Sequence, residues 1–159
     1  MQTIMITGCS SGFGLETARY FLEQGWKVIA TMRAPQEGVL PASDRLRLVR
    51  LDVTSAQSIA EAIAEVGEID VLVNNAGVGM LNALEGTPRE AIANLFATNT
   101  LGTIAMTQAV IPRFRARRSG TIVNITSAVT LQPMPLLAVY TASKAAVNAF
   151  TESLALELR

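Results

Sequence analysis

The sequence predicts an α/β fold built on a doubly wound parallel sheet, in a single domain that covers residues 1–159. Two observations predict the sheet. Short strand patterns alternate with helical patterns along the chain, and each strand is a nearly continuous apolar run, as in sheets covered on both faces. The size of the chain predicts the number of domains: 159 residues, half of them apolar, suit one domain with one core. Right-handed crossovers would place helices on both faces, and ligands bind at the carboxyl ends of such strands.

Nine elements are expected in order. The strands are Thr3–Thr7, Lys27–Thr31, Leu46–Leu51, Asp70–Val73 and Thr121–Ile125. The helices are Gly12–Gln24, Ala56–Val66, Pro88–Arg118, and Ala138 to the last residue. Gly25 is expected to cap the end of the first helix, Thr54 or Ser55 the start of the second, and Gly67 its end. The third helix is expected to be interrupted near Pro112, because proline lacks the amide hydrogen that continues a helix.

Composition excludes several kinds of chemistry. The chain has no histidine, so histidine bases, His-based triads and His-ligated metal sites are ruled out, and we expect no metal. Cys9 is the single cysteine, so no intrachain disulfide can form, which fits a reducing, cytoplasmic location. Cys9 itself is interpreted as a small loop residue rather than a nucleophile.

Charge and hydropathy argue against two classes of partner. Thirteen basic and thirteen acidic residues cancel, so nothing draws the chain to nucleic acid. The one basic run, which spans residues 113–118, is interpreted as a helix end whose cations the helix dipole favours. No apolar stretch reaches about 18 residues, and the N-terminus enters a strand pattern without a basic segment, so we expect neither a membrane span nor a signal peptide.

A glycine-rich turn, Thr7-Gly8-Cys9-Ser10-Ser11-Gly12-Phe13-Gly14, joins the first strand to the first helix. Glycines let a phosphate approach the backbone, and the following helix directs its free N–H groups at that phosphate. The turn departs from G-x-G-x-x-G, since Thr17 stands where the third glycine would be, and it lacks the lysine of a Walker loop. It predicts a dinucleotide phosphate site, with a turn that binds no ligand as the alternative.

The end of the second strand indicates which dinucleotide is bound. An NAD site usually has an acidic residue there, on the ribose 2′-hydroxyl, but this chain reads Thr31-Met32-Arg33. No carboxylate would repel a 2′-phosphate, Arg33 is available to bind one, and Ser11 could add a hydroxyl donor. We therefore predict that NADP(H) is preferred over NAD(H). The alternative is that Arg33 is simply an exposed residue after a strand.

Tyr140-Thr141-Ala142-Ser143-Lys144 places a phenol and an ammonium on one helix face. A phenol is a poor base near neutral pH, and a nearby ammonium favours the phenolate, which can exchange a proton with an alcohol oxygen. The pair alone could be structural. It gains weight because the segment that continues the fifth strand ends in Ser127, 13 residues before Tyr140, and because Thr98-Asn99 stands in the preceding helix.

Together these segments resemble the short-chain dehydrogenase/reductase family, and most closely its NADP-linked hydroxysteroid and retinol dehydrogenase branch. The matching motifs run the length of the chain in the order of that family: Thr7–Gly14, Ala30–Arg33, Asn74–Gly77, Thr98–Asn99, Ser127 and Tyr140–Lys144. The resemblance implies a Rossmann-type fold and an NADP(H)-dependent oxidoreductase that interconverts a secondary alcohol and a ketone or aldehyde. Its partners would be a small-molecule substrate and further copies of the chain, in a homodimer or homotetramer.

The resemblance also implies a role for each matched residue. Ser127 and Tyr140 would hold the substrate oxygen, with Tyr140 as general acid and base. Lys144 would bind the nicotinamide ribose and favour the ionised form of Tyr140, and Asn99 would connect a proton relay to solvent. The implied cofactor contacts are Gly8, Ser10, Ser11, Gly12, Phe13, Gly14, Arg33, Asp52, Val53, Asn75, Ala76, Gly77, Tyr140 and Lys144. Asp52 could instead be an ordinary turn residue.

Two other functions remain open. One is a non-catalytic dinucleotide-binding or redox-sensing module, against which Asn99, Ser127, Tyr140 and Lys144 argue together. The other is an epimerase or dehydratase with the same Tyr-x-x-x-Lys pair, against which the spacing of the glycine loop argues. Family members continue beyond the helix in which this sequence ends, so we expect a further C-terminal part, without which the fifth strand would be an unpaired edge.

Overall fold

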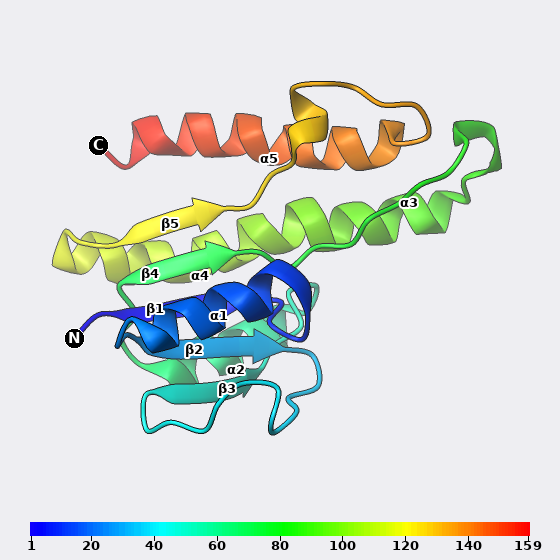
Figure 1. The fold of residues 1–159 in the computed structure, drawn as a ribbon. Coiled ribbons are helices and arrows are strands. Elements are labelled where there is room, and N and C mark those ends of the chain that lie inside the picture. Colours follow the sequence, from blue (N-terminus) through cyan, green and yellow to red (C-terminus); the bar gives the residue numbers. More distant parts are fainter.

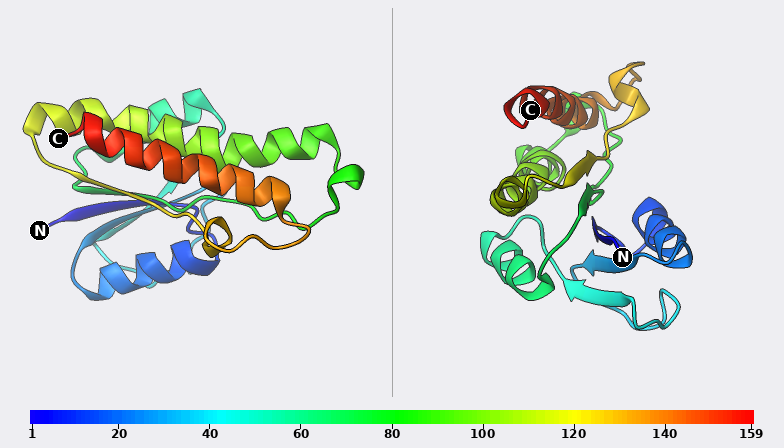
Figure 2. Two further views of the ribbon diagram at one scale, coloured as in Figure 1. Left: turned by 90° about the horizontal axis from the view of Figure 1, so that it is seen from above. Right: turned by 90° about the vertical axis from the view of Figure 1, so that its left-hand side faces the viewer.

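The computed structural model describes all residues from 1 to 159 and shows one parallel sheet in the order β3-β2-β1-β4-β5, with helices on both faces (Figures 1 and 2). The strands are β1 (Thr3–Thr7), β2 (Lys27–Met32), β3 (Leu46–Arg50), β4 (Val71–Asn74) and β5 (Thr121–Asn124). The long helices are α1 (Gly12–Glu23), α2 (Ala56–Val66), α3 (Arg89–Phe96), α4 (Gly102–Arg117) and α5 (Ala138–Glu157). Short turns are η1 (Leu84–Gly86), η2 (Ala97–Leu101) and η3 (Ala128–Thr130). The predicted fold class is confirmed.

Alternation along the strands builds a core on each face of the sheet. In β1, Ile4 and Ile6 point toward α1, whereas Met5 points toward α2 and α4, and all three are at most 1% exposed. The chain runs outward from β1 to β3 and then returns to β4 on the other side of β1. The strand order therefore reverses between β1 and β4, which is where a doubly wound sheet opens a crevice for ligands.

The expected helix ends are largely confirmed. Gly25 follows α1 with a φ of +82°, and Gly67 ends α2 with a φ of +74°. The Ser55 hydroxyl accepts a hydrogen bond from the Ser58 backbone N–H at 3.2 Å, so Ser55 rather than Thr54 caps α2. Most other boundaries differ from the expected ones by one residue.

The expected break near Pro112 is wrong. Helix α4 continues through Pro112 to Arg117, because Val110 and Phe114 on either side are buried in the core and their packing offsets the lost hydrogen bond. The irregularity lies earlier, at η2, which is one π-helical turn between α3 and α4. There the Thr103 hydroxyl donates to the Asn99 carbonyl at 3.0 Å, which gives that carbonyl a partner within the widened turn.

The arginines at the end of α4 tie the helix to neighbouring backbone. Arg113 donates to the Gly67 carbonyl at 2.7 Å and Arg115 to the Glu157 carbonyl at 3.2 Å. Arg117 donates to the carbonyl of Ile69 and lies over the Phe114 ring. Arg115 and Arg117 lie in the last turn of α4 and Arg118 is its C-cap, so residues 113–118 are the basic end of a helix, as interpreted from the sequence. No helix is both long and apolar enough to cross a membrane.

Candidate active site

The carboxyl ends of the strands open into a cavity of about 1190 Å³ that reaches from the loop after β1 to the start of α5. Residues from every strand end contribute to its walls. Of the residues singled out in the sequence, it gathers Gly8, Ser10, Ser11, Gly12, Phe13, Arg33, Asp52, Val53, Asn75, Ala76, Gly77, Ser127, Tyr140 and Lys144. Gly14 and Asn99 do not line the cavity, and each supports a part of its wall.

Two glycines of the loop after β1 are required by close packing. Gly8 has a φ of +74°, and a Cβ on it would lie 2.8 Å from the Cα of Ala76. A Cβ on Gly14 would lie 2.3 Å from the Gly8 carbonyl oxygen and 2.4 Å from Nδ2 of Asn75. No real Cβ tolerates such distances. The start of α1 can therefore approach β1 and β4 this closely only because both positions lack a side chain.

The N-terminus of α1 faces the cavity with its amide donors free. Ser11 is the N-cap in extended conformation, and its hydroxyl makes no capping hydrogen bond. Ser10, Ser11 and Gly12 are all exposed. The unpaired N–H groups and the positive end of the helix dipole together suit a phosphate group.

A hydrogen-bonded junction fixes this loop to the end of β4. Oγ1 of Thr7 accepts from the backbone N–H groups of Asn75 and Ala76 at 3.0 and 2.9 Å. Nδ2 of Asn75 donates to the carbonyls of Thr7 and Gly8 at 2.9 and 3.2 Å. Because Thr7 is 1% exposed, these bonds are shielded from water, and the loop is held in one position before any ligand binds.

Arg33 and Asp52 lie at the far end of the cavity, after β2 and β3. Arg33 is exposed and forms no ion pair or hydrogen bond within the chain, so its guanidinium is free for an anionic ligand. Oδ1 of Asp52 accepts from the backbone N–H and the hydroxyl of Thr54 at 2.9 and 2.7 Å. These bonds, with smaller help from nearby arginine charges, hold the pKa of Asp52 below its usual value. Asp52 is thus a turn residue that also lines the cavity.

Tyr140, Lys144 and Ser127 line the other end of the cavity. Lys144 is 5% exposed, and its ammonium donates to the Ile125 carbonyl at 2.9 Å without any carboxylate partner. Burial lowers the pKa of Lys144, because removal from water disfavours the charged form. Its Nζ would lie 3.4 Å from a Cβ placed on Gly77, so the ammonium sits beside the segment that follows β4. Ser127 is the N-cap of η3, and Tyr140 lies in the first turn of α5.

Asn99 lies behind this end of the cavity and links the segment after β4 to helix α5. Its side chain is fully buried at the π-helical turn. Oδ1 accepts from the backbone N–H of Val78 at 2.8 Å, and Nδ2 donates to the carbonyl of Val78 at 2.9 Å. Nδ2 also donates to the hydroxyl of Ser143 at 3.2 Å, and that hydroxyl donates to the Tyr140 carbonyl at 2.7 Å. One amide thus fixes the segment after β4 relative to the helix that carries Tyr140 and Lys144.

Cys9 takes no part in this chemistry. It is fully buried, and its thiol donates to the Ile6 carbonyl at 3.2 Å. Burial raises the pKa of the thiol to about 12, far from the range in which a thiolate nucleophile forms. The structure therefore agrees with the interpretation of Cys9 as a small loop residue.

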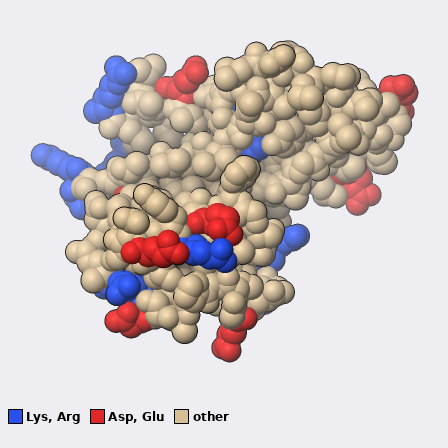
Figure 3. All heavy atoms as spheres, viewed as in Figure 1, with Lys and Arg blue, Asp and Glu red and all other residues tan.

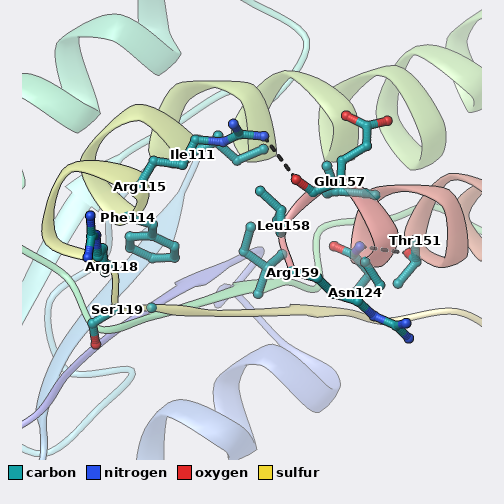
Figure 4. Close-up of a pocket in the computed structure, with 14 residues that line it drawn as sticks. Ile111, Phe114, Arg115, Arg118, Ser119, Asn124, Thr151, Glu157, Leu158 and Arg159 are labelled. Atoms are coloured by element: carbon teal, nitrogen blue, oxygen red, sulfur yellow. Dashed lines mark hydrogen bonds between the residues drawn. The ribbon is translucent and has the colours of Figure 1, made fainter.

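A second hollow of about 570 Å³ lies between α4, β5 and the end of α5 (Figure 4). Phe114 of α4 and Leu158 beyond α5 face into it, and Asn124 of β5 donates to the Thr151 hydroxyl at 2.8 Å across it. None of the sequence motifs reaches this hollow. It follows the outer edge of β5, which pairs only with β4, as the sequence led us to expect.

Sequence reasoning left some contributions to the site unassigned. It included Thr7 in the glycine-rich turn but gave its hydroxyl no role, although that hydroxyl accepts hydrogen bonds from Asn75 and Ala76. Ser143 lies inside the Tyr-x-x-x-Lys motif, but nothing in the sequence shows that its hydroxyl meets Asn99. Met80 lines the cavity from a segment without any motif.

The chain is similar to several known proteins in sequence and in fold. The family model described as short chain dehydrogenase matches residues 2–159. Retinol dehydrogenase 8 of Bos taurus is 41% identical over 99% of this chain, and 3-ketodihydrosphingosine reductase of Bacteroides thetaiotaomicron is 42% identical over 99%. The chain spans 54% and 58% of the lengths of these two relatives. The closed form of a serine dehydrogenase complexed with NADP+ superposes with a TM-score of 0.92 at 33% identity, over 99% of this chain and 67% of that structure.

Proposed function

Because the chain belongs to the short-chain dehydrogenase family, we propose that it is an NADP(H)-dependent oxidoreductase that interconverts an alcohol and a carbonyl compound. One observation carries the proposal. A single cavity holds a free helix N-terminus and an unpaired arginine at one end, and Tyr140, Ser127 and a buried lysine at the other. That pairing suits a long anionic dinucleotide whose reactive ring meets an acid–base group.

The residues present fit NADP(H) in charge and shape. The N-terminus of α1, with Ser10, Ser11 and Gly12, would hold the pyrophosphate, and Arg33 would bind the 2′-phosphate. Asp52 and Val53 would border the adenine. The serine dehydrogenase solved with NADP+ supports this choice over NAD(H). When bound, the cofactor supplies or accepts the hydride.

The residues at the other end of the cavity would transfer the proton. Ser127 and Tyr140 would orient the substrate oxygen, and the Tyr140 hydroxyl would give it a proton during carbonyl reduction or take one during alcohol oxidation. The Lys144 ammonium, held by the Ile125 carbonyl, would bind the nicotinamide ribose and stabilise negative charge on the phenol oxygen. Asn99 would hold both walls of the site in register.

The assembly and location are part of the same proposal. We propose a homodimer or homotetramer, since α5 buries only Ser143, Lys144 and Val147 along its length and leaves its other faces free for a second copy. A cytoplasmic location is supported by the single, buried cysteine.

The test is turnover by the purified protein, measured as NADPH oxidation with a panel of ketones and aldehydes. Tyr140→Phe should lower kcat by about 10²–10⁴-fold, the usual contribution of a general acid–base group, while the dissociation constant for NADPH stays within about twofold. Ser119→Ala, outside the cavity, is the matched control for loss of a hydroxyl. Full activity of Tyr140→Phe would refute the catalytic assignment. Binding of NADH as tight as that of NADPH would refute the cofactor assignment.

A further inference from the structure

The segment from residue 125 to 137 brings Ser127 to the cavity, yet it has little core packing of its own. Val129 is its only buried residue. No Asp, Glu, Lys or Arg occurs from residue 119 to 143, so no ion pair fixes the segment either. In Figure 3 the upper right of the molecule, where this segment lies in Figure 1, is accordingly almost entirely tan. A segment with so few buried apolar contacts depends on hydrogen bonds to its neighbours for a fixed position.

Helix α5 supplies these hydrogen bonds from the face that carries Tyr140. Tyr140, Lys144, Asn148 and Thr151 are spaced by four, four and three residues, and such spacing keeps side chains on one side of a helix. Lys144 binds the Ile125 carbonyl, as described above. The two side chains beyond it, Asn148 and Thr151, belong to none of the sequence motifs and do not line the cavity.

Each of these two side chains holds the chain at one side of Ser127. Nδ2 of Asn124, three residues before Ser127, donates to Oγ1 of Thr151 at 2.8 Å (Figure 4). Nδ2 of Asn148 donates to Oγ1 of Thr130, three residues after Ser127, at 3.0 Å. We call these two hydrogen bonds the first and the second anchor. Ser127 thus lies midway between two points of attachment to the helix that carries Tyr140.

The second anchor acts directly on Ser127. The Ser127 carbonyl accepts hydrogen bonds from the backbone N–H and the hydroxyl of Thr130, at 3.1 and 2.8 Å. Because the Thr130 hydroxyl donates its proton there, its oxygen is free to accept from Asn148. The Ser127 hydroxyl itself accepts only from the backbone N–H of Val129, at 3.4 Å, and donates to no group of the chain. Its proton is therefore available to a substrate oxygen, while its backbone is held from α5.

The first anchor continues into a buried network. Oδ1 of Asn124 accepts from Nδ2 of Asn74 at 2.8 Å, and the same Nδ2 donates to the Thr107 hydroxyl at 3.0 Å. Asn74 is 3% exposed, and its Oδ1 has no hydrogen-bond partner. A buried amide with an unpaired oxygen costs stability, whereas its directed bonds fix β4, β5 and α5 relative to one another. The network is therefore better suited to positioning than to stability.

We infer that Thr130 and Asn148 are positioning residues, which fix the place of the Ser127 hydroxyl relative to Tyr140 through the Ser127 carbonyl. The first anchor holds the same segment from its other end. The inference rests on the proposed function and adds to it residues that lie outside the cavity. A shift of a reacting group by about 1 Å can cost about 10²-fold in rate, so loss of an anchor acts on the rate of the reaction rather than on cofactor binding.

The first experiment removes the second anchor and measures turnover with NADPH and the carbonyl compound that the native protein reduces fastest. Thr130→Val keeps the shape of the side chain and should lower kcat about tenfold, with the dissociation constant for NADPH within about twofold. Asn148→Ala, which removes only the donor, should act in the same direction. Thr130→Ser keeps the hydroxyl and should stay within about twofold of the native kcat. Thr87→Val is the control, because the Thr87 hydroxyl donates to the Ala83 carbonyl at 2.8 Å and belongs to neither anchor nor cavity.

A second series separates positioning of Ser127 from general support of the fold. If the anchor acts through the Ser127 hydroxyl, Thr130→Val should change the rate of a Ser127→Ala protein by less than about twofold. Single-turnover oxidation of NADPH keeps these slow variants measurable. The inference would be overturned by an equal loss in both backgrounds, by an unchanged kcat of Thr130→Val, or by a fully active Ser127→Ala. Absence of turnover by the native protein with any carbonyl compound would overturn the proposed function, and this inference with it.

Discussion

Replacing Gly14 with alanine tests whether the start of α1 is held in place by direct backbone contact. The added Cβ would lie 2.3 Å from the Gly8 carbonyl oxygen and 2.4 Å from Nδ2 of Asn75. The carbonyl belongs to a backbone that β1 fixes, so it cannot move aside. The Asn75 amide can move only by giving up its bonds to the Thr7 and Gly8 carbonyls. The helix N-terminus must therefore shift outward.

The expected cost follows from these contacts. Overpacking costs about 1–3 kcal/mol, and the weakened amide hydrogen bonds add about 1 kcal/mol. Alanine returns up to about 1 kcal/mol through its better helix propensity. The free energy of unfolding should therefore fall by about 2 kcal/mol. NADPH affinity should fall at least about tenfold, because the displaced N–H groups no longer face the phosphate.

Urea unfolding and NADPH titration measure the two effects, and two other glycines serve as controls. Gly86→Ala should change neither quantity, since a Cβ there meets no atom within 4 Å. Gly25→Ala should cost about 1 kcal/mol through its φ of +82° but leave NADPH binding intact, because Gly25 lies at the opposite end of α1. If Gly14→Ala behaved like Gly86→Ala in both assays, the close approach of α1 to β1 would not exist as described.

Three further predictions concern buried groups. Asn99→Leu should lower the free energy of unfolding by about 2–4 kcal/mol and abolish turnover, since Val78 is left with an unpaired N–H and carbonyl; a urea curve like that of the native protein would contradict this. Cys9, fully buried with a pKa raised to about 12, should resist a thiol reagent at pH 8 until urea unfolds the protein, and fast labelling without urea would show otherwise. Burial lowers the pKa of Lys144 in the folded state, so just below pH 10.5 the unfolded chain binds more protons and stability must rise with pH there. As the pH rises toward 10.5, the native protein should therefore gain stability relative to Lys144→Met. Parallel pH profiles for the two proteins would show that burial does not disfavour the Lys144 ammonium.

The fold was predictable because it depends on patterns that act locally. Apolar runs between glycine- and serine-bearing ends marked each strand within about one residue, and alternation with helices fixed a parallel sheet. The convergence of the motifs also followed from topology alone, since carboxyl ends of parallel strands share one edge. Gly8, Arg33 and Ser127 could thus be assigned to one edge of the sheet from the sequence, and all three line the same cavity.

The π-helical turn at Ala97–Leu101 could not be predicted, because its cause lies far away in the sequence. Asn99 is fixed by Val78 and by Ser143, which is 44 residues distant, and neither partner leaves a local pattern around residue 99. The helix break near Pro112 was predicted wrongly because a local pattern was outweighed by packing. Proline favours a break, but the burial of Val110 and Phe114 on either side keeps the helix continuous.

One half of the cavity is built mainly from backbone and the other mainly from side chains, among them Lys144. The phosphate half is made mainly of backbone, so glycine spacing is enough to mark it. In the proposed catalytic half the Lys144 ammonium is 5% exposed, with only the Ile125 carbonyl as a partner, so we expect a methionine at this position to raise stability. A buried cation without a counter-ion is retained where a developing negative charge will meet it. Ser127, Tyr140 and Lys144 line the same cavity, so the phenol oxygen of Tyr140 is the proposed position of that negative charge.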